Sequence, residues 1–137
     1  MKKGDIIRFL NKSGLPIGRF YMIDKIVGKA IWVTNNIILK PFKLSVYQNI
    51  KVYTKCVALV SESDFTDLDK LHCVTYYHST SKQWDKIFDK QPEIIEFRVL
   101  GKKKRIFYKT DGIYRRIIDG KPCIRVYFEQ RLFRPLI

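Results

Sequence analysis

Hydrophobic and polar positions alternate in short runs along most of the chain, a pattern typical of strands that bury one face. Polar pairs such as Gly28-Lys29 and Asn35-Asn36 interrupt the runs and favour tight turns. In the N-terminal part, the pattern predicts five short strands, at residues 5–10, 18–27, 30–34, 37–40 and 50–60. Five short strands joined by polar turns suit a small, strongly bent antiparallel barrel.

One segment in the second half of the chain has the period of a helix. Thr80 and Gln83 have the spacing of a capping box, and Pro92 ends the pattern. Three large apolar side chains fall on one helical face: Trp84, Ile87 and Phe88. The pattern therefore predicts a helix over residues 81–91.

Strands are predicted on both sides of this helix, at residues 73–78, 93–100, 105–109, 113–118 and 123–129. The predicted turns are Gly101 with the lysines after it, Asp111-Gly112 and Asp119-Gly120, because Asp-Gly tolerates the positive φ angles of hairpin turns. The alternation assigns one set of side chains to the interior: Ile95, Phe97, Val99, Ile124, Val126 and Phe128. We expect the helix to pack on this face of an antiparallel meander.

Charge is distributed unevenly along the chain, which has 27 lysines and arginines, 13 acidic residues and a formal charge of +14. Residues 1–55 and residues 98–137 each carry a net charge of +9, whereas residues 56–97 carry −4. Two basic parts that flank an acidic middle indicate a polyanionic partner, nucleic acid before an anionic membrane surface.

Composition excludes several classes of protein. An apolar fraction of 46% and an aromatic fraction of 14% are too high for a disordered basic tail. No apolar run approaches the ~20 residues that span a bilayer, and the start of the sequence lacks the pattern of a signal peptide. We therefore expect a cytoplasmic protein without a membrane partner.

The sequence contains no arrangement that predicts catalysis or metal binding. Phosphate-loop, dinucleotide-binding and nucleophile-elbow motifs are absent from it. The three cysteines lack metal-ligand spacing, and the carboxylates of Asp64, Asp67 and Asp69 lack the glycine and terminal glutamate of a calcium loop. We expect no catalytic residue, no metal and no cofactor, and we expect the cysteines to be reduced.

The side chains expected on the outer face of the C-terminal strands are mostly cationic or aromatic. Cations bind phosphates and flat rings stack on bases, so this face is the candidate nucleic-acid interface. Its predicted residues are Arg98, Arg105, Phe107, Lys109, Arg116, Arg125 and Tyr127. Lys102, Lys103 and Lys104 precede Arg105, which makes a hairpin tip with four consecutive cations. In the first lobe, charge alone adds four candidates: Arg8, Arg19, Lys25 and Lys29.

Glycines lie at the ends of the strands predicted in the N-terminal part of the chain. Gly4-Asp5 opens the chain ahead of hydrophobic positions, Gly18 leads the second strand, and Gly28 separates it from Trp32. With these residues, about the first 60 positions resemble an SH3-like barrel of the KOW/Tudor kind. Proteins with such barrels often bind nucleic acid or the transcription machinery, and the resemblance implies both as partners here.

Two further families share features with this opening. In its small size, high charge and KOW-like start, the whole chain resembles the MotB early proteins of T-even-type phages, which bind DNA and modulate transcription. That resemblance implies a location in the host cytoplasm or nucleoid. The opening also resembles the MazF/PemK toxin endoribonucleases. Gly18-Arg19-Phe20 stands where that family has a Gly-x-x-Arg-Pro-type segment, so the sequence departs from it there.

Together these features predict an α+β protein that is mostly β. An SH3-like barrel at residues 1–60 is followed by an acidic connection at 61–71 and an α+β basic lobe at 72–137, with one helix on an antiparallel meander. The expected function is DNA binding with little sequence specificity through phosphate contacts, with double-stranded DNA preferred over RNA, in transcription modulation or nucleoid organisation. Two alternatives stay open: a MazF/PemK-like endoribonuclease, and an inhibitor that docks on a host protein.

Overall fold

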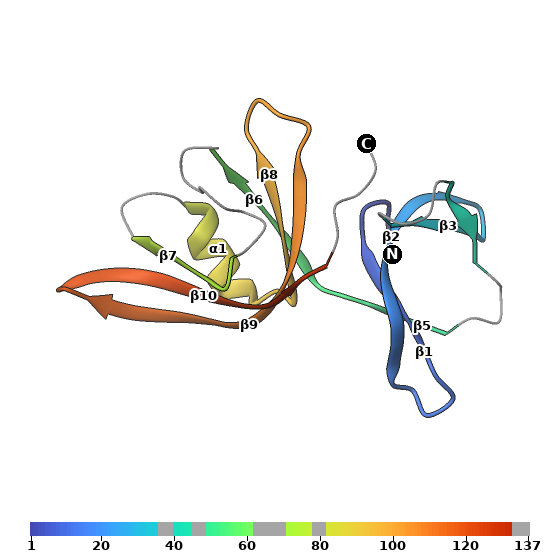
Figure 1. Cartoon of the computed structure of the whole chain (residues 1–137), viewed down its shortest axis with the longest axis horizontal. Helices are drawn as coiled ribbons and strands as arrows, with labels where there is room; N and C mark the ends of the chain where they lie inside the picture. The colour runs from blue at the N-terminus through green and yellow to red at the C-terminus, as the bar shows by residue number, and fades with distance from the viewer. Residues whose placement is uncertain (36–39, 45–48, 62–70, 78–81, 133–137) are drawn as a thin grey trace. The chain divides into compact units, whose positions relative to one another are not determined.

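The described residues form two compact units of largely antiparallel β-structure with one α-helix (Figure 1). The computed structural model describes residues 1–35, 40–44, 49–61, 71–77 and 82–132. Within these residues, unit 1 spans Met1–Thr54 and unit 2 spans Lys55–Leu132. No helix in the described part of the chain has the length and apolar character needed to cross a membrane.

Unit 1 is one five-stranded sheet. Its strands are β1 (Ile6–Leu10), β2 (Pro16–Val27), β3 (Ala30–Thr34), β4 (Phe42–Lys43) and β5 (Ile50–Val52). Their order is β4-β3-β2-β1-β5, so β4 and β5 are the outer strands, and the sheet does not close into a barrel within the described residues. The predictions of β1, β2 and β3 are confirmed, whereas the strand predicted at 37–40 lies mostly outside the described residues.

The long strand β2 connects the two halves of this sheet. Its first part, as far as Met22, pairs with β1, and its second part, from Met22 onward, pairs with β3. The pairing shifts register once on each side, and such bulges bend a strand. Among the described residues of the unit, Ile7, Ile23 and Val33 form one buried hydrophobic cluster, and Ile6, Phe20, Met22 and Tyr53 are buried as well.

The prediction of a single strand over residues 50–60 is wrong. β5 ends at Val52, and β6 (Lys55–Val60) belongs to the sheet of unit 2, where it pairs in parallel with β8 (Ile94–Val99). Between them, Tyr53 is buried and donates its N–H to the Ile6 carbonyl at 2.9 Å. A run of β-branched residues indicates extended backbone, but it carries no information about which sheet each part joins.

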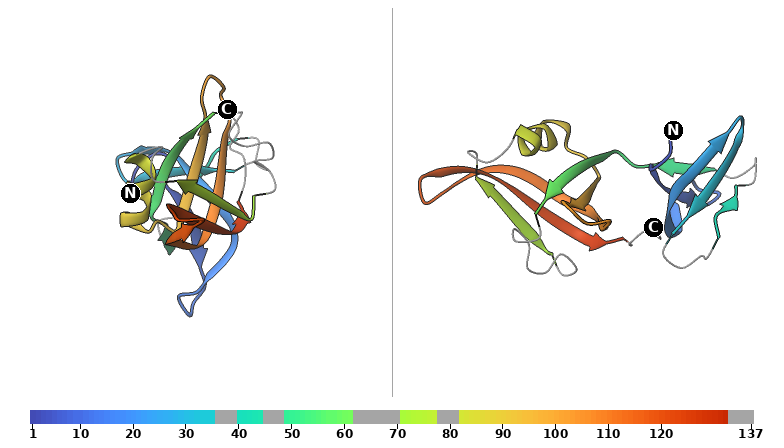
Figure 2. Two further views of the ribbon diagram at one scale, coloured as in Figure 1. Left: turned by 90° about the vertical axis from the view of Figure 1, so that its left-hand side faces the viewer. Right: turned by 90° about the horizontal axis from the view of Figure 1, so that it is seen from above.

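Unit 2 is a five-stranded sheet with helix α1 (Lys82–Lys90) on one face (Figure 2). The strand order is β6-β8-β9-β10-β7, where β7 is Cys73–Tyr77, β9 is Arg105–Ile118 and β10 is Lys121–Arg131. Every pair except β6–β8 is antiparallel. The predicted helix and the antiparallel arrangement of β8, β9 and β10 are therefore confirmed, and the parallel strand β6 is an addition to the predicted meander.

The core of unit 2 lies between α1 and the sheet. Trp84 and Ile87 are buried there, Phe88 is partly buried, and the Trp84 ring stacks on Tyr76 with 3.4 Å between ring centroids. All six side chains predicted to face inward belong to this core: Ile95, Phe97, Val99, Ile124, Val126 and Phe128. The alternation thus predicted the packing of this unit correctly.

The predicted turn at Asp111-Gly112 is wrong, because β9 continues through both residues. Tyr127 on β10 pairs with Gly112 and Phe128 pairs with Thr110, so Asp111 is an extra residue in a β-bulge. The other two predicted turns are confirmed. At the β9–β10 hairpin, Asp119 and Gly120 have φ angles of 51° and 76°, as a tight hairpin turn requires.

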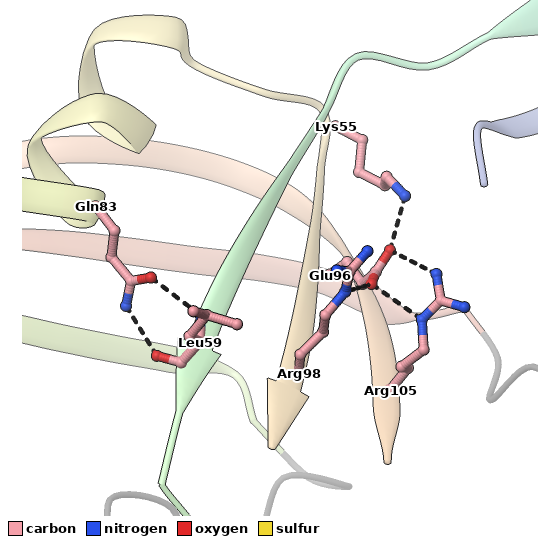
Figure 3. Close-up of polar contacts among 6 residues, drawn as sticks. All are labelled: Lys55, Leu59, Gln83, Glu96, Arg98 and Arg105. Atoms are coloured by element: carbon pink, nitrogen blue, oxygen red, sulfur yellow. Dashed lines mark hydrogen bonds and ion pairs between the residues drawn. The ribbon is translucent and has the colours of Figure 1, made fainter. Parts of the chain in front are cut away.

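Gln83 has a different role from the predicted cap. Its side-chain amide accepts a hydrogen bond from the Leu59 N–H at 3.0 Å and donates one to the Leu59 carbonyl at 2.8 Å (Figure 3). Leu59 lies on β6, an outer strand of the sheet. The amide therefore satisfies both main-chain groups of an edge residue and ties α1 to that edge. Thr80, the other residue of the predicted capping box, lies outside the described residues.

Candidate nucleic-acid interface

The face of the unit 2 sheet opposite α1, called here the outer face, carries most of the predicted site residues. Strand alternation places Arg125 and Tyr127 of β10 on this face, because Ile124 and Val126 face the core. The bulge at Asp111 shifts the alternation of β9 by one residue. As a result, Tyr114 and Arg116 join the outer face beside β10.

Tyr114, Arg116, Arg125 and Tyr127 form a cluster, called here the tyrosine–arginine patch. Tyr114 is directly opposite Arg125 in the β9–β10 register, and its ring meets that of Tyr127 at 67° with 6.0 Å between centroids. The guanidinium carbon of Arg116 lies 5.7 Å from the Tyr114 ring centroid, and that of Arg125 lies 5.4 Å from the Tyr127 ring centroid. Two rings and two cations thus alternate across adjacent strands.

A second cluster, called here the Glu96 cluster, lies on the same face where β6, β8 and β9 run together (Figure 3). Arg105 donates from Nε and from a terminal nitrogen to the two Glu96 carboxylate oxygens, at 3.0 and 3.1 Å. Lys55 donates to the same carboxylate at 2.7 Å, and Arg98 donates to it through Nε. Three cations share one carboxylate, so the cluster keeps a net positive charge.

Glu96 is fully buried, and its ionisation depends on these partners. Burial alone would raise its pKa, because a low-dielectric site disfavours the charged form. The hydrogen bonds from Arg105, Lys55 and Arg98 outweigh burial and lower the pKa of Glu96 to about 2. The carboxylate is therefore ionised at neutral pH, and it holds Arg98 and Arg105 in place.

The expectation that Phe107 is exposed is wrong. Its side chain is completely buried, although it lies on the outer face opposite Glu96. Lys55 Nζ lies 5.5 Å and the Arg105 guanidinium carbon 5.6 Å from its ring centroid. This part of the outer face is covered, so strand alternation predicted the face of Phe107 but not its exposure. Phe107 supports the cations of the Glu96 cluster and offers no ring for stacking.

The predicted hairpin tip lies between β8 and β9. Lys102 and Lys103 are exposed and Lys104 is half-buried, after Gly101 turns the chain with a φ of 75°. Arg105 is the first residue of β9 and belongs to the Glu96 cluster rather than to the exposed part of the tip. Farther along β9, Lys109 forms an ion pair with Glu129 of β10.

The four candidates in unit 1 do not share one environment. Arg8 donates to the Gly18 carbonyl at 3.0 Å, and its guanidinium carbon lies 4.8 Å from the Phe20 ring centroid. Lys25 lies over Trp32, with Nζ 4.6 Å from the ring centroid. Arg19 and Lys29 are exposed. Arg8 and Lys25 are therefore placed by contacts within the unit.

Neither Tyr114 nor the cluster around Glu96 is among the site features predicted from the sequence. With Asp111-Gly112 taken as a turn, residues 113–118 form a separate strand. The sequence then does not show which of their side chains lie beside which residues of β10. Had these two residues been taken as a bulge within one strand, the shifted alternation would have placed Tyr114 beside Arg125. Lys55 was predicted to belong to the N-terminal lobe, so nothing in the sequence indicated that it contacts Glu96.

In comparisons with known proteins, no family model, curated protein or solved structure matches the chain. Among the described residues, no group of three or more His, Cys, Asp or Glu side chains is placed to hold a metal ion. The predicted acidic residues Asp64, Asp67 and Asp69 lie outside the described residues. The candidate interface contains the cations and rings described above.

Proposed function

We propose that the protein binds DNA with little sequence specificity, through phosphate contacts made by the outer face of unit 2 and by the adjacent lysine tip. The observation that carries this proposal is the tyrosine–arginine patch, in which two guanidinium groups lie beside two rings on one sheet face. Arginine binds phosphate oxygens with directed, charge-assisted hydrogen bonds. Such contacts fix a protein on nucleic acid without reading its sequence.

The Glu96 cluster supports the same function in a different way. Its carboxylate orients Arg98 and Arg105, and three cations on one anion leave positive charge for an external phosphate. Oriented guanidinium groups lose less conformational entropy on binding than free ones. Modulation of transcription or organisation of a nucleoid is the process that such binding would serve, with double-stranded DNA preferred over RNA.

Unit 1 is proposed to be a relative of SH3-like barrels of the KOW/Tudor kind. Support comes from the strand order β4-β3-β2-β1-β5 and from the bulged strand β2, which pairs with β1 and β3 along its two parts. A strand shared in this way lets five strands curve around a small core. Arg8, Arg19, Lys25 and Lys29 are the residues through which this unit would add phosphate contacts.

The test uses two adjacent arginines on opposite faces of β9. Arg116 lies in the tyrosine–arginine patch, whereas Arg115 pairs with Asp85 of α1 at 3.4 Å and lies over Phe88. Arg116→Gln and Arg115→Gln remove the same charge from neighbouring positions. Affinity for a labelled DNA duplex is measured by fluorescence anisotropy at several salt concentrations, and a duplex RNA of the same sequence is the second arm.

Wild-type protein is expected to show a log–log salt slope of roughly −5 to −7, as for about 6–8 neutralised phosphates. Arg116→Gln should weaken binding by roughly tenfold and flatten the slope by about 0.9, because one charge-assisted phosphate contact is lost. Arg115→Gln should leave both unchanged. A slope near zero, or equal effects of the two substitutions, would contradict the proposal. Tighter binding to the RNA duplex would contradict the preference for DNA.

A further inference from the structure

Tyr114 presents its ring to solvent from the middle of a long strand. Its side chain lies on the outer face, and the residue is 47% exposed. The ring lies directly above Gly112, because a Cβ atom at that glycine would stand only 2.5–2.7 Å from three atoms of the ring. Glycine at position 112 therefore makes the space in which the ring rests against the sheet. A large, exposed ring that rests against the sheet is suited to stacking.

The second ring of the patch lies beside the first. Tyr127 is half-buried on β10, and its cross-strand partners are Gly112 on β9 and Cys73 on β7. The rings of Tyr114 and Tyr127 are in edge contact, so each restricts the movement of the other. They form a short aromatic surface that is held by two strands of one sheet.

The charges within the patch and its cross-strand partners are of one sign. The residues paired with the patch across β7, β9 and β10 are Gly112, Cys73, Thr75 and Cys123, in addition to the Tyr114–Arg125 pair itself. No acidic residue is among them, in contrast to the Glu96 cluster. Arg125 is held further by a hydrogen bond from its Nε to Cys73 Sγ at 3.3 Å. Arg116 thus lies at one end of the patch, Tyr114 and Arg125 lie opposite each other in its middle, and Tyr127 lies at the other end.

We infer that the tyrosine–arginine patch binds single-stranded nucleic acid, with unpaired bases stacked on Tyr114 and Tyr127 and the flanking phosphates on Arg116 and Arg125. The charge part of this inference rests on the proposed function, and the stacking part goes beyond it. In a duplex, neighbouring base pairs cover the faces of each base. Only unpaired bases offer a free face to a protein ring, and stacking tolerates any base sequence.

The experiment distinguishes the contribution of the bases to affinity from that of the phosphates. Fluorescence anisotropy compares three labelled probes at one salt concentration: a 15-nucleotide thymidine strand, an abasic strand with the same number of phosphates, and a DNA duplex of equal length. Wild-type protein should bind the thymidine strand at least tenfold more tightly than the abasic strand, since each stacked base contributes roughly five- to 150-fold. Equal affinity for the two strands would overturn the inference.

Two double variants provide the matched comparison. Tyr114→Phe with Tyr127→Phe keeps both rings, and Tyr114→Leu with Tyr127→Leu keeps apolar side chains but removes the rings. The phenylalanine variant should retain the preference for the thymidine strand, and the leucine variant should bind that strand only as well as the abasic one. Gly112→Ala should resemble the leucine variant, because the new methyl group displaces the Tyr114 ring. Unchanged thermal unfolding and an unchanged far-UV circular dichroism spectrum identify variants that are folded.

The outcomes distinguish this inference from the proposed function. If the leucine variant binds the thymidine strand like wild-type protein while duplex affinity is high, the stacking surface is wrong and duplex binding stands. If wild-type protein binds the thymidine strand in a ring-dependent way but not the duplex, the stacking surface stands and the proposed function fails. If no probe is bound, both are wrong.

Discussion

The two units place their cations against different partners. Unit 1 has ten lysines and arginines and two acidic residues, whereas unit 2 has sixteen and eleven. In unit 1, Arg8, Lys25 and Lys51 lie over the rings of Phe20, Trp32 and Tyr53, which are buried or half-buried. In unit 2, a buried carboxylate binds three cations, and an exposed tyrosine lies between two arginines.

This difference shows that the number of cations in a region does not locate a binding face. Unit 1 has the larger excess of cations over acidic residues, but the rings under its cations are buried or half-buried and serve to place those cations. Unit 2 has the smaller net charge, yet it presents a ring and two guanidinium groups on one face of its sheet. Orientation and exposure of a few side chains distinguish the units more sharply than composition does.

The largest expected difference between the units is in the free energy of unfolding that is lost when a tryptophan ring is removed. Trp84→Ala removes a ring that is 3% exposed and stacked on Tyr76, so it should lower the free energy of unfolding by about 3–5 kcal/mol. Trp32→Ala in unit 1 removes a half-buried ring and should cost less. Urea denaturation followed by far-UV circular dichroism measures both. An unchanged midpoint for Trp84→Ala would show that the packing of α1 on the sheet is wrong.

Acid should destabilise unit 2 through Glu96. Its pKa is lowered from 4.5 to about 2 in the folded protein, so the ionised form stabilises the fold above pH 4.5, and this contribution is lost as the pH falls toward 2. The loss amounts to roughly 3 kcal/mol. The unfolding free energies of wild-type protein and Glu96→Gln should therefore converge between about pH 5 and pH 2.

The matched control is Glu129→Gln, which removes the exposed partner of Lys109. An exposed pair contributes about 0–1 kcal/mol, so this variant should follow the wild-type pH profile closely. Parallel profiles for wild-type protein and Glu96→Gln would mean that the three cations do not depend on the Glu96 carboxylate.

Two triple variants compare the units as phosphate-binding surfaces. Replacing Lys102, Lys103 and Lys104 with serine should change stability by no more than about 0.5 kcal/mol, because these residues lie in a turn. The same change should weaken binding to all DNA sequences equally and flatten the salt slope by roughly 2–3 units. Replacing Arg19, Lys25 and Lys29 with serine removes equal charge from unit 1 and should have a smaller effect. A larger effect of the Arg19, Lys25 and Lys29 variant would show that the main binding surface lies on unit 1.

The smallest expected effect concerns a single cation on a ring in unit 1. Lys25→Gln removes an ammonium group 4.6 Å from the Trp32 centroid and should lower the unfolding free energy by about 0.5–1 kcal/mol. Fluorescence of Trp32, measured in a Trp84→Phe background, reports the change in its environment. A loss of DNA affinity larger than that of the Lys102, Lys103 and Lys104 variant would show that Lys25 contacts phosphate directly.

Local patterns predicted the parts of this fold that depend on short-range periodicity. The spacing of Trp84, Ile87 and Phe88 predicted α1, and the alternation of Ile124, Val126 and Phe128 predicted the inner face of β10. Both follow from geometry within one element. The Asp119-Gly120 turn was predicted for the same reason.

The errors share a dependence on contacts between distant residues. Whether Asp111-Gly112 is a turn or a bulge depends on the partner strand, because Tyr127 and Phe128 of β10 determine the register there. The buried residues Glu96 and Phe107 both contact Lys55, about 40 and 50 positions away in the sequence. Periodicity assigns a side chain to one face of a strand, but it does not show whether that face is covered.

The amide of Gln83 has a consequence for how this protein behaves at high concentration. A sheet whose outer strand displays unpaired main-chain groups can recruit a strand from another molecule, which is a common first step toward aggregation. At Leu59, the Gln83 side chain already occupies both the N–H and the carbonyl that such an incoming strand would use. One glutamine on α1 thus acts as a substitute for a neighbouring strand, and it protects β6 from intermolecular pairing at that position.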